Sequence, residues 1–345
     1  MSRFNSLLFY GLFCVLAVLA AKLGWITSYI QIILMFIGIN VILSTSLNLV
    51  NGYMGEFSVG HAGFMAVGAY ITSVLNVYLF TNSQVFGPSV LSPSSALYLF
   101  PLTLLIGGIG AALAGLLVAV PSFRTRGDYL AIITLAVNYI VKSSIENMQP
   151  IGGARGFMGM RNVVNAMQEA VNLPWMLIWV LIGVYACVFV LHRFVNSTYG
   201  KGIVAVRDDE IAAEIMSVNT KHMKLAAFML SSGLAGVAGG LFAHVLGYIN
   251  PGTFTIMKST EVLVMVYLGG MGSLSGSVLS AIGLTIILEL LRPLQVAKWV
   301  VVPLLLILLM LFRPEGLLGQ RELSDVFPRL KKIFTARKEV PDAAS

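Results

Sequence analysis

Apolar runs recur along this chain, and most are long enough to cross a lipid bilayer as a helix. A membrane-spanning helix needs about 20 consecutive, mostly apolar residues. Only 11% of the 345 residues are charged, against about 25% in soluble domains. The expected fold class is therefore all-α, a polytopic bundle of helices in a lipid bilayer. We predict about ten membrane helices, near residues 5–23, 28–50, 57–80, 96–120, 128–147, 174–194, 222–246, 254–270, 273–291 and 298–313.

Two of these predicted helices have unusual features. The eighth, 254–270, contains Lys258 and Glu261 and ends in two glycines, so we expect it to be short or re-entrant. The first follows Arg3 and could be mistaken for a secretion signal. It is longer than the usual apolar part of such a signal and more helices follow it, so we expect it to be retained.

The basic residues predict the orientation. They concentrate in 193–224 and after 313, and Arg124 and Arg126 lie between the fourth and fifth helices. Basic loops stay in the cytoplasm, so ten crossings place both termini inside and loops 81–95, 148–173 and 247–253 outside. We divide the chain into a membrane domain, 1–319, and a basic cytoplasmic tail, 320–345. The net charge of +7 follows this pattern and does not indicate nucleic-acid binding.

A faint internal repeat is also present. Met54–Ser58 resembles Met271–Ser275, and Ala66–Gly68 resembles Ala281–Gly283, in the same order. Such an echo is expected of a chain built from two related halves, as many transporters are. Small residues also recur by chance in membrane helices, and the sequence leaves both explanations open.

A polar segment, 195–221, interrupts the apolar runs and predicts a short cytoplasmic helix. Asp208 and Asp209 suit the start of such a helix, where acidic groups stabilise the helix dipole. Arg207, Glu210 and Glu214 would share one face, and Ile211 and its neighbours another. A helix lying on lipid is usually rich in Lys and Arg, whereas this segment is acidic at its centre. The charge therefore favours docking to a soluble protein over lying on the membrane.

Stretches spread over nearly the whole chain resemble, in order, the motifs of branched-chain amino-acid ABC transporter permeases. The polar segment Arg207–Glu214 resembles the coupling loop of that family. A departure from the family pattern is Ser217, where members commonly have glycine. The other matching stretches are Ser46–Phe64, Arg126–Ile132, Leu268–Ser273 and Phe312–Leu317.

This resemblance implies a set of partners. Such permeases pair as two related membrane subunits in the bacterial inner membrane, bind two cytoplasmic ATP-binding subunits, and receive solute from a periplasmic binding protein. ATP and Mg²⁺ would be held by the partner ATPases, and this chain would bind no cofactor and catalyse no reaction. The residues that the resemblance assigns to contact with the ATPase are Arg207, Asp208, Asp209, Glu210, Ile211 and Glu214.

Candidates for the translocation path are polar residues inside apolar helices. A charge at the bilayer centre costs about 2.5–3.5 kcal/mol on insertion scales, so such residues are functional candidates. Glu56, Ser58, Gly60 and His61 fall in a glycine-rich stretch that permits a broken helix, and Glu261 lies in the eighth predicted helix. The alternative for the first group is close helix packing, with His61 bonded to a backbone carbonyl. The alternative for Glu261 is an ion pair with Lys258 near the outer surface.

The function predicted is that of an ABC importer permease for branched-chain amino acids or a similar small polar solute. Relatives with the same architecture carry urea, amides or aromatic acids, so the solute stays open. A stand-alone ion-coupled transporter is an alternative of another class; it needs charged groups at mid-span, and its one candidate, Glu261, lies off-centre in its predicted helix. A membrane-embedded enzyme is disfavoured, because the sequence has no catalytic triad, metal motif or paired mid-membrane carboxylates.

Overall fold

The computed structural model describes residues 11, 14–82, 86–123, 129–293, 298–312, 315–319 and 321–323. These residues are mainly helical and include a two-stranded ladder, so the all-α prediction is confirmed. Arg124, Arg126, the start of the first predicted helix and nearly all of the predicted tail, 320–345, lie outside the described residues.

Six helices in the described residues are long and apolar enough to cross a membrane. Three further apolar helices are shorter, so the count of about ten crossings stays a prediction. The six long segments are α2 (Ser28–Asn48) with the π-helical turn η1 (Leu49–Tyr53), α3 (His61–Phe80), α4 (Ala96–Ser122) with its leading turn η2 (Pro93–Ser95), α5 (Tyr129–Asn147), α7 (Trp175–Val195) and α10 (Thr220–Leu246). The shorter ones are α11 (Ile256–Gly269), α12 (Leu274–Leu290) and α13 (Lys298–Phe312).

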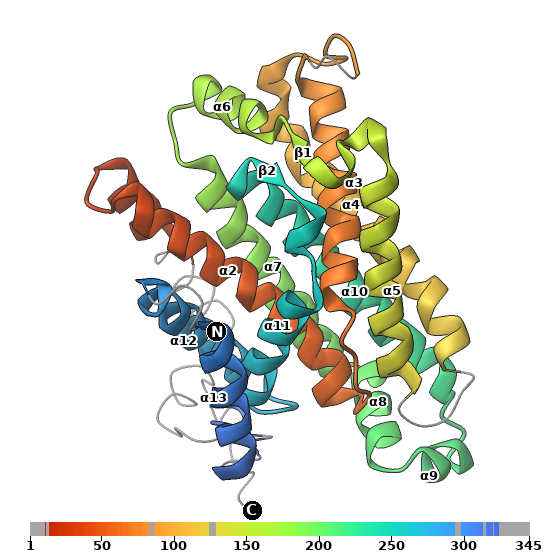
Figure 1. Ribbon diagram of the computed structural model, residues 1–345. Helices are drawn as coiled ribbons and strands as arrows, with labels where there is room; N and C mark the ends of the chain where they lie inside the picture. The colour runs from red at the N-terminus through yellow and green to blue at the C-terminus, as the bar shows by residue number, and fades with distance from the viewer. Residues whose placement is uncertain are drawn as a thin grey trace, which may run out of the picture.

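The segments that connect the long helices lie at two opposite ends of the bundle (Figure 1). One end carries the short helices α8 (Thr198–Asp208) and α9 (Glu210–Ile215), and we call it the α9 end. The opposite end carries the ladder of β1 (Phe157–Met158) and β2 (Tyr248–Ile249), where Phe157 pairs with Ile249. We call it the β1 end. The three loops predicted to lie outside the cell are thus together, and the polar segment is at the far end from them.

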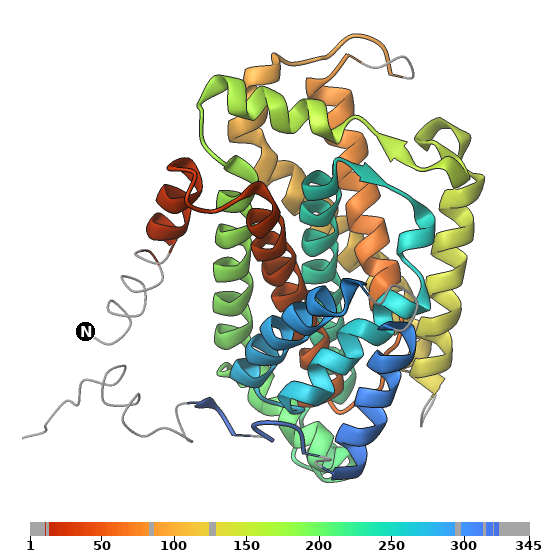
Figure 2. The same ribbon diagram turned by 60° about the vertical axis from the view of Figure 1, so that its left-hand side comes forward.

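A helix that the sequence analysis did not predict covers the β1 end. This helix, α6 (Met160–Ala170), lies across the ends of the long helices (Figures 1 and 2). It buries Met160, Val163 and Met167 against them. These residues are spaced three and four apart, the pattern of an amphipathic helix.

The centre of the bundle is built by close contact of α10 with α3 and α4. Small residues let membrane helices approach until their backbones touch. A methyl group added at Gly68 would lie 2.2 Å from the α-carbon of Gly236, and one at Gly239 would lie 2.0 Å from the carbonyl oxygen of Met65. Larger residues at these positions would therefore force the helices apart.

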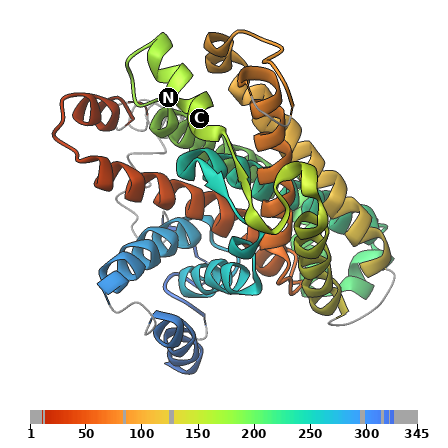
Figure 3. The same cartoon turned by 45° about the horizontal axis from the view of Figure 1, so that its top comes forward.

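The second part of the chain packs on the outer side of α2. Figure 3 shows α12 beside α2, with α13 next to α11 at the edge of the bundle. At the α9 end, Asn48 donates a hydrogen bond to the carbonyl oxygen of Ser273, at 2.9 Å, and accepts one from the backbone N–H of Gly272, at 3.0 Å. The chain just before the first echoing segment thus lies against the start of the second, Met271–Ser275, while the descent of the two segments from a repeat stays a prediction.

Helix α11 is short, as the sequence predicts for its eighth helix. It has 14 residues, or about 21 Å at 1.5 Å per residue, which is less than the ~30 Å hydrocarbon core. The chain enters the bundle before α11 starts, because the ring of Phe254 packs against the rings of Tyr70 and Phe242. Lys258 and Glu261 in its first turns therefore lie inside the bundle.

The residues after α13 fold back under the α11–α12 junction. The backbone N–H of Leu317 donates to the carbonyl oxygen of Leu268, at 2.8 Å. The carboxylate of Glu322 accepts hydrogen bonds from the backbone N–H groups of Leu274 and Ser275, at 2.9 and 3.0 Å. Those groups begin α12, so Glu322 satisfies N–H donors that have no partner within the helix.

Candidate functional site

The polar segment forms two short helices instead of the single helix predicted. The break is at Asp209, whose extended backbone (φ −158°, ψ 109°) ends α8 and starts α9. Its carboxylate accepts hydrogen bonds from the backbone N–H groups of Ile211 and Ala212, at 2.9 and 3.0 Å. This is the N-cap geometry that favours aspartate. Asp209 therefore starts a helix as predicted, but Asp208 is the last residue of α8.

Because of this break, the prediction that Arg207 shares a face with Glu210 and Glu214 is wrong. Arg207 points back into the bundle, where its Nη1 donates to the carbonyl oxygen of Gly52 at 3.1 Å. Its Nε and Nη2 donate to one carboxylate oxygen of Asp208, at 3.1 and 2.9 Å. Arg207 thus joins α8 to the end of the long α2–η1 segment.

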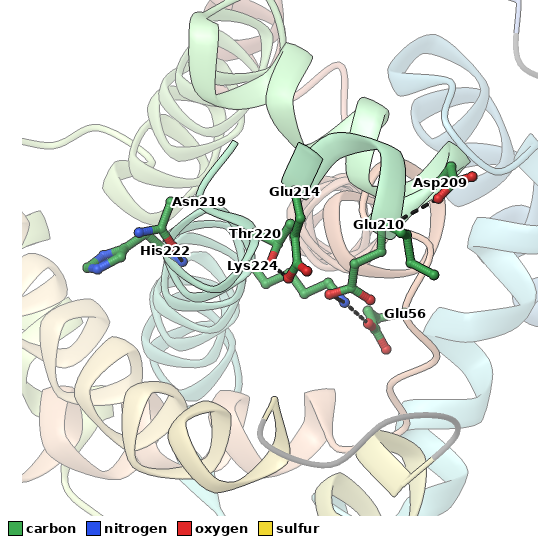
Figure 4. Close-up of polar contacts among 9 residues, drawn as sticks. Glu56, Asp209, Glu210, Glu214, Asn219, Thr220, His222 and Lys224 are labelled. Carbon is green, nitrogen blue, oxygen red and sulfur yellow. Dashed lines mark hydrogen bonds and ion pairs between the residues drawn. The ribbon is translucent and has the colours of Figure 1, made fainter. Parts of the chain in front are cut away.

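A lysine that the sequence analysis did not single out as a site residue holds α9 against the bundle. The Nζ of Lys224 lies 2.8 Å from an oxygen of Glu56 and 3.0 Å from an oxygen of Glu210 (Figure 4). Its side chain is only 11% exposed. Glu56 comes from the chain between η1 and α3, and Lys224 from the second turn of α10. We call Lys224, Glu56 and Glu210 the ion triad. It joins α9 to α10 and to the chain just before α3.

The exit from α9 is also fixed by hydrogen bonds. The carboxylate of Glu214 accepts from the hydroxyl of Thr220, at 3.1 Å (Figure 4). The backbone N–H groups of Ser217 and Val218 donate to the carbonyl oxygens of Glu214 and Ala213, the pairing of a Schellman helix end. Ser217 has φ +62°, a conformation that glycine adopts without strain. The structure thus explains why glycine is favoured at this position.

The surface of α9 that is turned away from the bundle is apolar. Ile211, Ile215 and Met216 are 66%, 77% and 78% exposed. We call these three residues the α9 apolar patch. The acidic side chains of α9 point back to the ion triad and to Thr220, so the predicted apolar stripe faces out and the predicted charged face is used internally. Met216 was missed in the sequence, although its position next to Ile215 in the apolar pattern could have indicated it.

The polar residues predicted near the translocation path are mostly packed inside the bundle. The Nε2 of His61 lies 2.8 Å from the hydroxyl of Ser46, and the backbone N–H of Ser58 donates to the side-chain oxygen of Asn51, at 3.3 Å. Both side chains are 2% exposed. At Gly60 an added methyl group would lie 2.4 Å from the carbonyl oxygen of Thr134, so this glycine allows α5 to approach closely.

Glu56 and Glu261 belong to two different places. Glu56 is part of the ion triad at the α9 end. Glu261 lies 3.1 Å from the Nζ of Lys258 on α11, which agrees with the ion pair considered as its alternative. Lys258 also donates to Asn40, at 3.2 Å. Asn40 lies past the midpoint of α2, so this pair is well inside the bundle and not at its outer surface.

Comparison with known proteins identifies the family of this chain. The family model described as "Branched-chain amino acid transport system / permease component" matches residues 29–312. This chain belongs to that family. The permease is 33% identical over 304 residues to the high-affinity branched-chain amino acid transport system permease protein LivM of Escherichia coli, covering 81% of the chain and 68% of the relative.

Two further relatives extend the comparison. The permease is 23% identical to the probable branched-chain amino acid transport permease protein LivM of Methanocaldococcus jannaschii, over 88% of the chain and 96% of the relative. It is also 30% identical to the E. coli permease protein named LivH, over 43% of the chain and 48% of that protein. No solved structure matches the chain.

Proposed function

We propose that this chain is one of two permease subunits of an ATP-driven importer for branched-chain amino acids in the bacterial inner membrane. The main support is the α9 apolar patch, which lies on a helix held rigidly to the bundle at the end opposite the β1–β2 ladder. A soluble partner with an apolar groove could bind this small apolar projection. The family membership favours a cytoplasmic ATP-binding subunit as that partner.

The proposal extends to the other components. Two ATP-binding subunits hold ATP and Mg²⁺ and hydrolyse the nucleotide, while this chain carries out no catalysis. A periplasmic binding protein delivers the solute to the β1 end, and both termini lie in the cytoplasm. The second permease subunit is a related chain; the similarity to LivH, which is named as a permease protein of the same kind of system, supports this.

The geometry also suggests how ATP-driven motion reaches the membrane helices. A push on α9 is passed to α10 through Lys224 and to the chain before α3 through Glu56. A parallel contact, from Arg207 to Gly52, passes motion of α8 to α2. Displacement of the polar segment therefore moves α2, α10 and the chain before α3 together instead of bending a free loop.

A charge placed in the α9 apolar patch tests the proposal. We expect Met216→Glu combined with Ile215→Glu to abolish copurification of the ATP-binding subunits and ATP-dependent uptake of leucine into proteoliposomes. The permease should keep its thermal stability, because both side chains are exposed. Met158→Glu is a matched control, since Met158 is an apolar residue of similar exposure, 68%, at the β1 end. It should leave copurification unchanged.

Three results would each contradict part of this proposal. Full copurification and coupled uptake by the doubly charged variant would show that α9 does not dock. Uptake of urea, an amide or an aromatic acid in preference to leucine would be compatible with an ATP-driven importer but would contradict a branched-chain amino acid as its solute. Uptake by the permease alone, without ATP and with an ion gradient, would instead favour the ion-coupled transporter.

A further inference from the structure

The ion pair of Lys258 and Glu261 borders a cavity between α2, α10, α11, α12 and α13. The cavity has a volume of about 300 Å³, at the small end of the ~300–1,000 Å³ typical of ligand pockets. Asn40, Thr285, Lys258 and Glu261 line its polar side. Its apolar wall is made by Ile33, Phe36, Phe242, Met257 and Leu288.

Lys258 and Glu261 have hydrogen-bonding capacity that no described residue satisfies. In the described part of the chain, the Nζ of Lys258 donates to Glu261 and Asn40, which leaves one of its three donors. The Glu261 carboxylate accepts there only the bond from Lys258, although a carboxylate can accept about four. Asn40 is held by Thr285, at 2.9 Å between the amide nitrogen and the hydroxyl. The remaining hydrogen-bonding capacity is therefore available to a ligand in the cavity.

The cavity extends from Asn40 away from the α9 end, as far as Glu289 and Arg292. Helix α12 begins beside the end of α2, so its last turn lies by the first turn of α2. There Arg292 and Glu289, which also line the cavity, are 2.9 Å apart, and Tyr29 donates a hydrogen bond to Glu289. A ligand entering past this outer pair would reach Lys258 and Glu261 deeper in the bundle.

We infer that this cavity is a transient binding site for a zwitterionic amino acid with an aliphatic side chain. The α-carboxylate would bind Lys258, the α-ammonium would bind Glu261, and the side chain would lie on the wall that includes Phe36 and Phe242. Partly buried charges of both signs beside an apolar wall match the three parts of such a ligand. The inference rests on the proposed function for its ligand and adds where in this chain that ligand binds.

The first test uses the ligand's own charges and does not depend on the binding protein. In a Cys14→Ser, Cys187→Ala background, Met257→Cys places a thiol at the cavity wall, where Met257 is 53% exposed. We expect millimolar leucine to slow modification of this thiol by a polar maleimide in the purified permease complex. 4-Methylpentanoate, which lacks the ammonium, and 3-methylbutylamine, which lacks the carboxylate, should not. Met158→Cys is the control, and leucine should not protect it.

The second test removes the charges one at a time. Lys258→Met and Glu261→Gln should each lower leucine uptake at saturating binding protein by at least about tenfold, since each removes a charge-assisted hydrogen bond to the ligand. Each should also abolish protection of the Met257→Cys thiol. The control variants are Lys142→Met and Glu146→Gln on α5, where the two side chains form an i,i+4 ion pair at 3.6 Å; each should change uptake less than about twofold.

The outcomes separate the site from the proposed function. The unmodified complex could import leucine while leucine gives no protection and the Glu261→Gln variant transports normally. In that case the proposed binding site is wrong and the proposed importer function is unaffected. If the unmodified complex does not import leucine at all, the proposed function is wrong. If the charge variants fail to fold, the protection experiment in the otherwise unmodified chain still decides.

Discussion

At the scale of single residues, the lysine of the ion triad has a larger role than its sequence position indicates. Lys224 lies in a run that contains other basic residues, and nothing local distinguishes it from Lys221. The structure buries Lys224 between two carboxylates and leaves Lys221 exposed. The difference arises from the packing of α10 against the chain before α3, which sequence spacing cannot show.

Lys224→Met should therefore destabilise the permease. It leaves the largely buried Glu56 carboxylate without its cation, at a cost of about 1–3 kcal/mol, whereas Lys221→Met should change stability by less than about 0.5 kcal/mol. Thermal unfolding in detergent measures both. Adding Glu56→Gln to Lys224→Met should restore most of the lost stability but not ATP-coupled uptake. Equal effects of the two lysine substitutions would argue against the ion triad.

Ser217→Gly should stabilise the exit from α9. A non-glycine residue in the left-handed region costs roughly 1–2 kcal/mol, and the extra freedom that glycine gives the unfolded chain offsets part of this gain. We expect a net gain of about 0.5 kcal/mol, measured as slower hydrogen exchange of the amides of Ser217 and Val218. Ser217→Ala, which keeps the strain, should show no such slowing.

At the scale of elements, most helix positions could be predicted because apolar length alone determines them. The run predicted at 96–120 is observed at Ala96–Ser122, and that at 254–270 at Ile256–Gly269. The coupling helix was predicted to start at Asp208 and Asp209, and α9 does start at the Asp209 cap, but the separate helix α8 before it was not predicted. Helix α6 was not predicted, since its apolar spacing is short and lies in a polar loop.

The cap at Asp209 is what separates α8 from α9. Asp209→Ala should cost α9 about 1 kcal/mol and accelerate hydrogen exchange of its amides roughly fivefold in the permease without ATPase. Asp208→Ala is the matched control, because the side chain of Asp208 is 64% exposed and, among the described residues, pairs with Arg207 alone; ion pairs at exposed positions contribute little. Similar exchange in the two variants would mean that Asp209 is not the cap.

At the scale of the whole molecule, the loops predicted for the two sides of the membrane lie at opposite ends of the bundle, while the end that faces the cytoplasm stays a prediction. The site could be predicted only in part. The acidic residues of the coupling segment and Glu261 were identified by their charge in apolar surroundings, whereas Lys258, Asn40 and Thr285 come together only through the packing of α2, α11 and α12. Such long-range juxtaposition leaves no local pattern in a single sequence.

The orientation itself has a direct test. In the cysteine-free background described above, Met216→Cys should react with a membrane-impermeant maleimide only in inside-out vesicles, and Met158→Cys only in intact right-side-out vesicles. Both side chains are exposed, so accessibility depends on the side of the membrane and not on burial. Reaction of Met216→Cys from the outside would place α9 outside the cell and remove the basis for ATPase docking.

The fold-back of the chain after α13 has a practical consequence for anyone who engineers this permease. The carboxylate that caps α12 comes from position 322, close to where a shortened gene would naturally be cut. Deleting the chain from Arg321 onward would remove that carboxylate and its hydrogen bond to Tyr53, at 3.2 Å. The backbone N–H groups of Leu274 and Ser275 would then lose their acceptor. Truncated variants and C-terminal reporter fusions should therefore retain the chain at least through Leu323.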